Sequence, residues 1–392
     1  MTRPKIDRSE FDERRKKVQT LMKEKDIDLI IAFSDDRFVV GQAHARWLIN
    51  YQPQFEPAFV MVPQEGEIFV ATGTESEAFV LVSSYCSQVR VTPEFVIPGE
   101  EYSYATVVPF DDVIKELEDQ IGRKVKSVGL AGKEQISYRL YKSLANKFGN
   151  ENIVDIEADI MELRAIKSEA EIRVIEYAFS IADKGIQTAY DAIEEGRTER
   201  EIAAEAEYVM RKMGSEGTGV ELMVSSGPEN TAPIMSRTTF RKIRKNDLIS
   251  LTFAVRYEGY HGPVSRPIIF GKPDPEVQKA IELAIEAQAE TRALLRPGVR
   301  GCELDRASRR LLNENNLGEH FVYTGVHSTG VMEFEPPILT SEYQGVLKEN
   351  MVFAIDIPLF FNKWGGFRIE NGFHIVKDGY RALNSLEVKY IK

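Results

Sequence analysis

Two runs of strand-forming residues meet at the dipeptide Glu258-Gly259, within the stretch from Asp247 to Pro273. A two-residue turn at this dipeptide makes the runs an antiparallel hairpin. It also fixes the register, because a slip by one residue would move every side chain to the other face. The facing pairs are then Thr252 with Ser265, Ala254 with Pro263, and Arg256 with His261. Such a long hairpin needs further layers to cover it, so the chain must fold around a sheet.

The two faces of this hairpin differ in polarity. One face carries the polar residues Thr252, Arg256, His261 and Ser265, and Arg266 is assigned to it as well. The other face is apolar and suited to packing under helices, with Leu251, Phe253, Val255 and Val264. Pro263 cannot donate a ladder hydrogen bond, so it indicates an edge, a bulge or a break that faces a ligand. We predict that the polar face is the floor of a pocket, and the alternative is that it meets solvent.

Composition narrows the function classes. The 392 residues are enough for two or three domains. A net charge of −11 disfavours a nucleic-acid partner, and no stretch reaches the roughly 18 apolar residues of a membrane span. Cys86 and Cys302 are the only cysteines, which argues against a disulfide scaffold or a thiolate metal cluster. We expect a cytoplasmic protein that binds neither membrane nor nucleic acid.

The sequence pattern divides the chain into two domains. Helix and strand patterns alternate through residues 1–160, which predicts a small α/β domain. A long helical pattern begins after Lys167, and residues 161–392 form the second domain. Within it, segments 195–202 and 296–304 each combine a glycine turn with a Glu and an aliphatic residue that open an amphipathic helix. The two copies indicate either two related halves or a chance similarity.

Several segments occur together in an order that is typical of a known family. They are Arg164-Ala-Ile-Lys-Ser, the hairpin, Gly325-Val-His-Ser-Thr-Gly, Asn350-Met-Val-Phe-Ala-Ile-Asp and Gly366-Phe-Arg-Ile-Glu. Together they resemble the creatinase, prolidase and aminopeptidase P family over nearly the whole chain. The resemblance implies an α/β (α+β) fold, in which a smaller creatinase-type N-terminal domain precedes a pita-bread catalytic domain of two pseudo-symmetric halves. It also implies a homodimer.

The metal-binding set of this family is matched only in part. In the metallopeptidase members, two ions are held by two Asp on the hairpin, a His and two Glu. His327 matches the His, Asp356 replaces the first Glu, and Glu370 matches the second. The two hairpin positions fall on Thr252 and Pro263. Because two dications need bridging carboxylates, this loss disfavours a dinuclear site.

The leading interpretation is therefore a metal-free hydrolase. The family contains two enzymes of this kind, creatinase and ectoine hydrolase, which act on carbon–nitrogen bonds in small solutes. The segment Tyr260-His-Gly-Pro-Val-Ser-Arg266 resembles ectoine hydrolase, and Phe334 stands where the family has a substrate-binding His. We expect a small polar substrate of guanidino, amidine or cyclic amidine type, and no cofactor.

This interpretation gives the candidate residues definite roles. His327 or His261 serves as base and then as acid, since imidazole titrates near neutral pH. Asp356 and Glu370 lie on adjacent strands by the resemblance and hold a cationic centre. Without a cation, one of these two carboxylates has a raised pKa. The predicted substrate-binding residues are Thr252, Ser265, Arg266, Phe334 and Arg368.

Two other functions stay open. The first is an Xaa-Pro dipeptidase-like or aminopeptidase-like metallohydrolase with a degenerate site, in which His327, Asp356 and Glu370 hold one Mn, Zn or Co ion. The second is a pita-bread protein that binds a ligand without turnover. Two structural interpretations compete with the site itself: His327 as a core histidine bonded to a backbone carbonyl, and Arg368 with Glu370 as a structural ion pair.

Overall fold

The computed structural model describes residues 3–37, 39–99 and 102–392. The chain forms two compact units, residues 6–164 and residues 165–392, and residues 3–5 belong to the second unit. The boundary predicted at residues 160 and 161 lies inside helix α6 (Glu157–Ala165), and the change of unit falls at the end of this helix. None of the helices in the described ranges combines the length and the apolarity needed to cross a bilayer.

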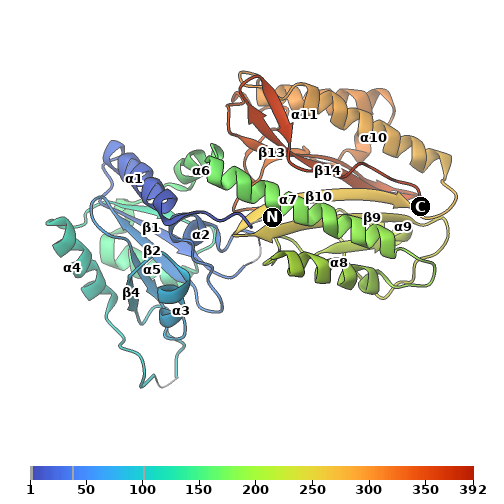
Figure 1. Ribbon diagram of the computed structural model, residues 1–392. Coiled ribbons are helices and arrows are strands. Elements are labelled where there is room, and N and C mark those ends of the chain that lie inside the picture. Colours follow the sequence, from blue (N-terminus) through green and yellow to red (C-terminus); the bar gives the residue numbers. More distant parts are fainter. Residues whose placement is uncertain (1–2, 38, 100–101) are drawn as a thin grey trace. The chain divides into compact units, whose positions relative to one another are not determined.

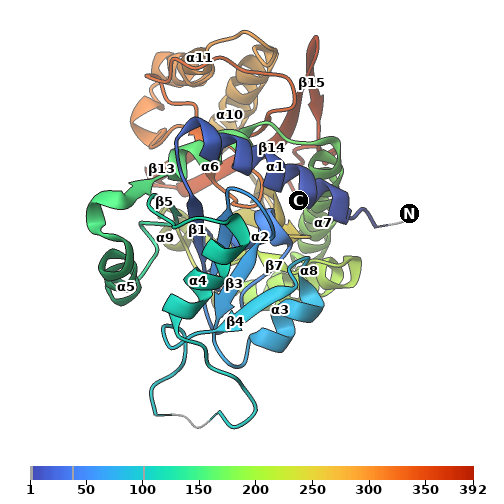
Figure 2. The same ribbon diagram turned by 90° about the vertical axis from the view of Figure 1, so that its left-hand side faces the viewer.

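The N-terminal unit is built on a mixed sheet in the order β4-β3-β2-β1-β5-β6. Its strands are β1 (Leu29–Ser34), β2 (Ala58–Pro63), β3 (Phe69–Thr72), β4 (Gln88–Val91), β5 (Val128–Ala131) and β6 (Ile153–Asp155). The helices that accompany them are α1 (Arg8–Glu24), α2 (Ala43–Ile49), α3 (Glu77–Ser83), α4 (Phe110–Ile121) and α5 (Tyr138–Phe148), shown in Figure 2. The α/β character predicted for this part of the chain is confirmed.

The core of this unit joins α4 and α5 to one face of the sheet. Alternate residues of β1, namely Leu29, Ile31 and Phe33, point into it because side chains of a strand alternate between faces. They meet a row of apolar residues from α4: Phe110, Val113, Ile114 and Leu117. These spacings of three and four residues place the row on one side of the helix. The burial of these α4 residues explains why a helical pattern of apolar residues is visible in the sequence.

A half-buried carboxylate, that of Glu157, connects α6 to α2 in this unit. Glu157 accepts a hydrogen bond from the backbone N–H of Gly132 at 2.7 Å, and its Oε2 lies 3.2 Å from Nε2 of His44. Burial alone would raise the pKa of Glu157. The hydrogen bond and charge of His44, together with the Gly132 N–H, instead lower that pKa to about 2. The ionised form of Glu157 therefore stabilises the folded unit.

Replacing Glu157 by glutamine should lower the free energy of unfolding of this unit by about 2–3 kcal/mol at pH 6. The folded pKa of Glu157 lies below its ordinary value of 4.5, so this stabilisation is present above that value and is lost as pH falls towards 2. By pH 3.5 we expect the difference between wild type and variant to shrink by about half. Trp47 lies in this unit and Trp364 in the other, so denaturant unfolding in a Trp364→Phe background isolates the transition.

The control for this prediction is Glu151→Gln, because Glu151 is an exposed residue of the same unit. We expect a change within about 0.5 kcal/mol at either pH. A difference between Glu157→Gln and wild type that grows as pH falls would contradict the assignment.

The second unit is built on a sheet in the order β12-β11-β13-β14-β10-β9-β7, with β15 beside β14 and β8 beside β9. Its strands are β7 (Gly217–Thr218), β8 (Met223–Ser226), β9 (Leu248–Tyr257), β10 (Tyr260–Ile269), β11 (Val326–Ser328), β12 (Glu335–Ile338), β13 (Val352–Asn362), β14 (Gly365–Val376) and β15 (Gly379–Ala382). The helices include α7 (Glu169–Ala192), α8 (Glu199–Met213), the short α9 (Gly227–Thr231), α10 (Pro275–Ala293) and α11 (Gly301–Glu314).

Two similar halves make up this unit. In the first half α7 and α8 precede the hairpin β9-β10, and in the second half α10 and α11 precede the hairpin β13-β14. Figure 1 shows α7 and α8 along β9 and β10, and α10 and α11 beside β13 and β14. The halves join in the sheet where β10 pairs with β14, with Ser265 opposite Glu370. The repeat at segments 195–202 and 296–304 opens α8 and α11, so it marks equivalent positions of the two halves.

The register predicted for the first hairpin is confirmed. Thr252 faces Ser265, Ala254 faces Pro263, and Arg256 faces His261. Glu258 and Gly259 both have positive φ angles, 47° and 78°, which the right-handed twist of a two-residue hairpin turn requires.

Both faces of the hairpin are buried, so the alternative of a solvent-exposed polar face is wrong. On the apolar face, Gly262 allows α7 to approach closely: a Cβ there would lie 2.4 Å from the backbone nitrogen of Phe179. Arg266 faces Leu251 across the hairpin, so its assignment to the polar face is also wrong. The reason is the alternation of side chains along a strand, which places residues 265 and 266 on opposite faces.

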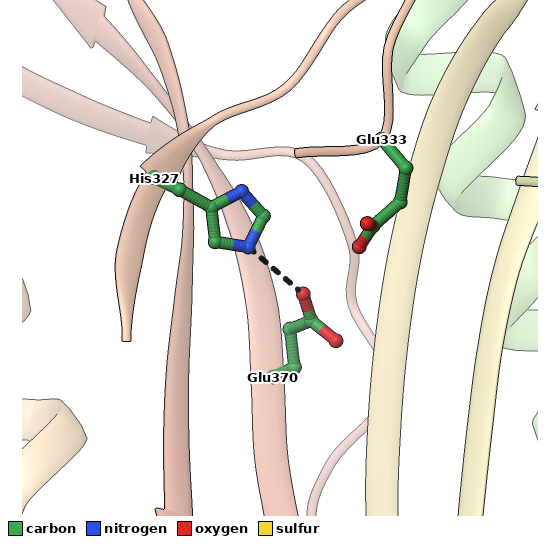
Figure 3. Close-up of side chains that lie close together, drawn as sticks. All are labelled: His327, Glu333 and Glu370. Atoms are coloured by element: carbon green, nitrogen blue, oxygen red, sulfur yellow. Dashed lines mark ion pairs between the residues drawn. The ribbon is translucent and has the colours of Figure 1, made fainter. Parts of the chain in front are cut away.

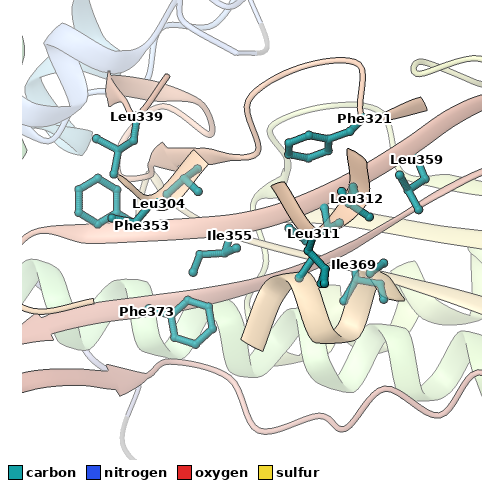
Figure 4. Close-up of a cluster of buried hydrophobic side chains, with 14 of the residues drawn as sticks. Leu304, Leu311, Leu312, Phe321, Leu339, Phe353, Ile355, Leu359, Ile369 and Phe373 are labelled. Atoms are coloured by element: carbon teal, nitrogen blue, oxygen red, sulfur yellow. The ribbon is translucent and has the colours of Figure 1, made fainter. Parts of the chain in front are cut away.

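The second hairpin separates an apolar face from a polar one by the same alternation. Figure 4 shows Phe353, Ile355, Ile369 and Phe373 in a buried cluster with Leu311 and other residues of α11. The residues between them, Asp356 and Glu370, face each other across β13 and β14. They must therefore point away from this cluster. The packing of α10 and α11 thus fixes the direction in which both carboxylates point.

Candidate active site

His327 lies on the short strand β11 and is buried. Its Nδ1 is 3.0 Å from the backbone carbonyl of Ser328, and since a carbonyl can only accept, Nδ1 is the donor. This bond leaves Nε2 to face Glu370, whose Oε1 lies 3.6 Å away. The interpretation of His327 as a histidine bonded to a backbone carbonyl thus describes one of its nitrogens, while the other is directed at a carboxylate.

Glu370 is held from two sides in the middle of β14. The hydroxyl of Ser265 donates to Oε2 at 2.9 Å, and His327 approaches Oε1. Ser265 is therefore a neighbour of the site, through a bond that orients Glu370. Its predicted role in substrate binding stays a prediction.

A third side chain, Glu333, completes a group that is suited to a metal ion. Figure 3 shows the carboxylates of Glu333 and Glu370 and the ring of His327 directed towards a common point. One ligand atom from each of the three lies within 4.8 Å of the others. One imidazole and two carboxylates are ligands that Zn and Mn accept, so a divalent cation fits these residues.

The charges of this group shift two pKa values. Burial opposes protonation of His327, but the hydrogen bond with Glu370 and the charges of Glu333 and Glu370 raise its pKa to about 9. Burial raises the pKa of Glu333, the charge of His327 lowers it, and the charge of Glu370 raises it, with a net increase. A dication would take the place of the His327 proton, so metal binding should release protons.

Asp356 belongs to a neighbouring cluster. Its Oδ2 accepts from the hydroxyl of Tyr323 and lies 3.8 Å from Nη1 of Arg368. Arg368 also donates to the carbonyl of Ile234 at 2.7 Å, and its guanidinium carbon lies 5.1 Å from the ring centre of Phe360. The expected structural pair of Arg368 with Glu370 is thus replaced by a pair with Asp356.

The prediction that one carboxylate of the Asp356 and Glu370 pair has a raised pKa is confirmed for Asp356. Burial raises this pKa to about 7, with a further contribution from the charge of Glu370, against the lowering effects of Arg368 and Tyr323. Within the described residues, Asp356 is outside the group of ligand atoms formed by His327, Glu333 and Glu370.

The other predicted site residues Phe334, His261 and Thr252 make different kinds of contact. The ring of Phe334 packs on that of His327, with 4.4 Å between the ring centres. His261 bonds through Nδ1 to the carbonyl of Gly330 at 3.0 Å. Thr252 lines a small cavity of about 10 Å³ that Arg368 also lines. The roles predicted for these residues stay predictions.

Arg266 forms hydrogen bonds with the backbone. It donates to the carbonyls of Ser265, Glu370 and Leu386, at distances between 2.6 and 2.8 Å. These bonds link β10 to β14 and to the C-terminal segment. Its predicted contact with substrate stays a prediction, and the geometry shows a structural role.

Sequence reasoning missed Glu333, Tyr323 and the pair of Lys167 with Glu335. Lys167 Nζ lies 2.6 Å from Glu335 Oε1, and both side chains are buried. Glu333 is not among the positions that were matched to the metal-binding set of the family, so a comparison with that set passes over it. One sequence feature could have indicated Glu333 as a site residue: its carboxylate stands between the apolar residues Met332 and Phe334.

Comparison with protein families decides the assignment. The model of metallopeptidase family M24 matches residues 173–377, which is more than half of the chain. The chain belongs to this metallopeptidase family. The creatinase/prolidase N-terminal domain matches residues 14–166, so both units of the chain have a counterpart among known domains.

Individual relatives agree with this assignment. The chain is 30% identical over 329 residues to a protein named Xaa-Pro dipeptidase from Pyrococcus horikoshii, covering 84% of this chain and 89% of the relative. A protein of the same name from Pyrococcus furiosus is 28% identical over 332 residues, covering 84% of this chain and 93% of the relative. Among solved structures, the prolidase from Pyrococcus horikoshii superposes with a TM-score of 0.82 at 25% identity, covering 96% of this chain and 99% of the other.

These comparisons correct two expectations. The leading interpretation, a metal-free creatinase-like hydrolase of a guanidino or amidine solute, is wrong, because two relatives that each match 84% of this chain are named Xaa-Pro dipeptidase. The expectation of no cofactor is wrong as well, because the family is one of metallopeptidases and three side chains of this chain form a group that suits a metal ion. The fold prediction, a pita-bread domain after a creatinase-type domain, is confirmed.

Proposed function

We propose that this metallopeptidase is a metal-dependent dipeptidase that cleaves the bond before a C-terminal proline. The observation that carries the proposal is the group formed by His327, Glu333 and Glu370 in a chain that resembles Xaa-Pro dipeptidases over 84% of its length. A divalent ion bound by this group would supply Lewis-acid polarisation of the scissile carbonyl and activation of water.

The residues of the chain hold this group in place. The Nδ1 bond of His327 to Ser328 sets the ring tautomer that leaves Nε2 available as a ligand, and the packed ring of Phe334 restricts its rotation. The hydroxyl of Ser265 occupies one oxygen of Glu370 and leaves the other directed at His327. The ligands are therefore oriented before any ion arrives, which reduces the cost of binding.

The neighbouring cluster offers a charge that matches the carboxylate end of a dipeptide. Arg368 Nε is buried and makes no hydrogen bond within the described part of the chain. Arg368 would hold the carboxylate of the C-terminal proline. This residue thus supports a substrate that has a free carboxylate next to the scissile bond.

Turnover of dipeptides tests this function. The full chain is stripped with a chelator, reloaded with Mn, Zn or Co, and assayed for proline release from Ala-Pro, with Pro-Ala and Ala-Ala as matched substrates. We expect turnover of Ala-Pro only in the metal-loaded form, and a loss of at least ~100-fold after chelation. Equal turnover before and after chelation, or no proline release with any of the three metals, would contradict the proposal. The homodimer and cytoplasmic location expected from the sequence stay predictions.

A further inference from the structure

The first hairpin lacks the carboxylates that a pair of metal ions needs. Thr252 offers a neutral hydroxyl, and Pro263 offers no side-chain ligand. Ser265, which faces Thr252 across the hairpin, already donates to Glu370. Two dications close together need shared anionic ligands to screen their repulsion, so this face cannot hold a second ion beside the first.

Glu333 is a carboxylate whose charge is opposed by that of His327, a member of the same group of ligand atoms. It lies half-buried in the loop between β11 and β12, and among the described residues it makes no hydrogen bond and no ion pair. Its carboxylate is directed at a second carboxylate, that of Glu370, as Figure 3 shows. Two like charges this close are unfavourable unless a cation or a proton lies between them.

The loop that carries Glu333 is fixed at both ends. The carbonyl of Gly330 accepts from the backbone N–H of His261 at 2.9 Å, and Glu335 is paired with the buried Lys167. The loop packs close to Gly219, where a Cβ would lie 2.9 Å from Cβ of Glu333. Glu333 is thus held in its position rather than resting there through a flexible loop.

Asp356 differs from Glu333 in having partners of its own. Tyr323 and Arg368 both approach its Oδ2, so its charge is compensated without a metal. It also lies outside the 4.8 Å group. Among the carboxylates near His327 and Glu370, Glu333 is therefore the one whose charge a bound cation would compensate.

We propose that this metallopeptidase binds a single divalent ion, and that Glu333 replaces the missing hairpin carboxylates as its third protein ligand beside His327 and Glu370. The inference rests on the proposed function for the presence of a metal. It differs from that function in the number of ions and in the ligand that it names.

Metal binding, measured without an assay of activity, tests the inference. The chelator-stripped full chain is titrated with Co²⁺, followed by calorimetry and by the visible absorption of the ion. We expect one ion per chain for the wild type. We expect Glu333→Gln to bind at least ~100-fold more weakly, because loss of a direct ligand should exceed the loss caused by an outer partner. At the same free concentration, Co²⁺ should raise the melting temperature of the wild type more than that of Glu333→Gln.

The matched control is Asp356→Asn, which removes a buried carboxylate next to the group. We expect it to keep one ion per chain with an affinity within about tenfold of the wild type. Two ions per wild-type chain would overturn the inference while leaving the dipeptidase proposal intact, and this measurement does not depend on whether a variant folds. Equal affinities of wild type and Glu333→Gln would also overturn it. A metal-binding result as expected, without turnover of Ala-Pro, would reject only the proposed function.

Discussion

Replacing His327 by alanine should lower kcat/KM for Ala-Pro by about 10³-fold or more in the metal-loaded enzyme. The variant removes the one nitrogen ligand of the group and leaves Glu333 and Glu370 as two adjacent carboxylates. The several kcal/mol of stabilisation that a metal supplies to the developing charge would be lost with the ion. Steady-state proline release at saturating Co²⁺ or Mn²⁺ measures the effect, and far-UV circular dichroism checks that the sheet is intact.

His320→Ala is the control, because His320 lies in the short helix Gly318–His320 and bonds through Nδ1 to the carbonyl of Phe360, outside the group. We expect its kcat/KM to stay within about threefold of the wild type, as for a change away from the reacting atoms. A His327→Ala enzyme that keeps more than a tenth of the wild-type kcat/KM would exclude the proposed centre.

The register of the first hairpin was the part of the site that the sequence could predict. A two-residue turn and strict alternation are enough to place Thr252 opposite Ser265, and the structure has this pair. The family resemblance placed Asp356 and Glu370 on adjacent strands, and the structure shows them directly opposite each other. Both depend on regular backbone geometry, which repeats along a strand and is therefore readable from residue spacing.

The position of Glu333 could not be predicted from residue spacing, because this residue lies on a loop. Its direction depends on the Lys167 and Glu335 pair, whose members are 168 residues apart, and on the backbone of Gly219. No local pattern encodes such contacts. The sequence argument compared family positions and found carboxylates missing at Thr252 and Pro263. A carboxylate can be absent from a matched position while other elements supply ligands in space, so the missing carboxylates at Thr252 and Pro263 did not exclude a metal.

The same contrast applies to Arg266 and Arg368. Both are arginines next to site residues in sequence, and both were predicted to bind substrate. Arg266 donates hydrogen bonds to three backbone carbonyls, whereas Arg368 lies beside Asp356 and lines a cavity. Which partner a long side chain reaches is decided by packing across elements, so residue type and position alone do not separate the two cases.

Lys167 and Glu335 form the interaction whose loss should cost the most stability. Their side chains are each 1% exposed and 2.6 Å apart, and the pair links the segment before α7 to the start of β12. Removing one member of a buried ion pair leaves the other charge in a medium of low dielectric constant. We expect Lys167→Met to lower the free energy of unfolding of the second unit by about 3–5 kcal/mol. Denaturant unfolding followed by Trp364 fluorescence in a Trp47→Phe background measures it.

The double variant Lys167→Met with Glu335→Gln separates the cost of an isolated charge from the net value of the pair. Without the Glu335 charge there is no buried carboxylate to desolvate, so we expect the double variant to be more stable than Lys167→Met alone, by about 1–3 kcal/mol. A double variant no more stable than the single one would show that the cost comes from lost packing of the lysine stem instead. Because Glu335 also fixes the loop of Glu333, the double variant should bind Co²⁺ more weakly than the wild type even where it folds. The buried contact between Lys167 and Glu335 would then determine both the position of the Glu333 loop and the affinity of the site for Co²⁺.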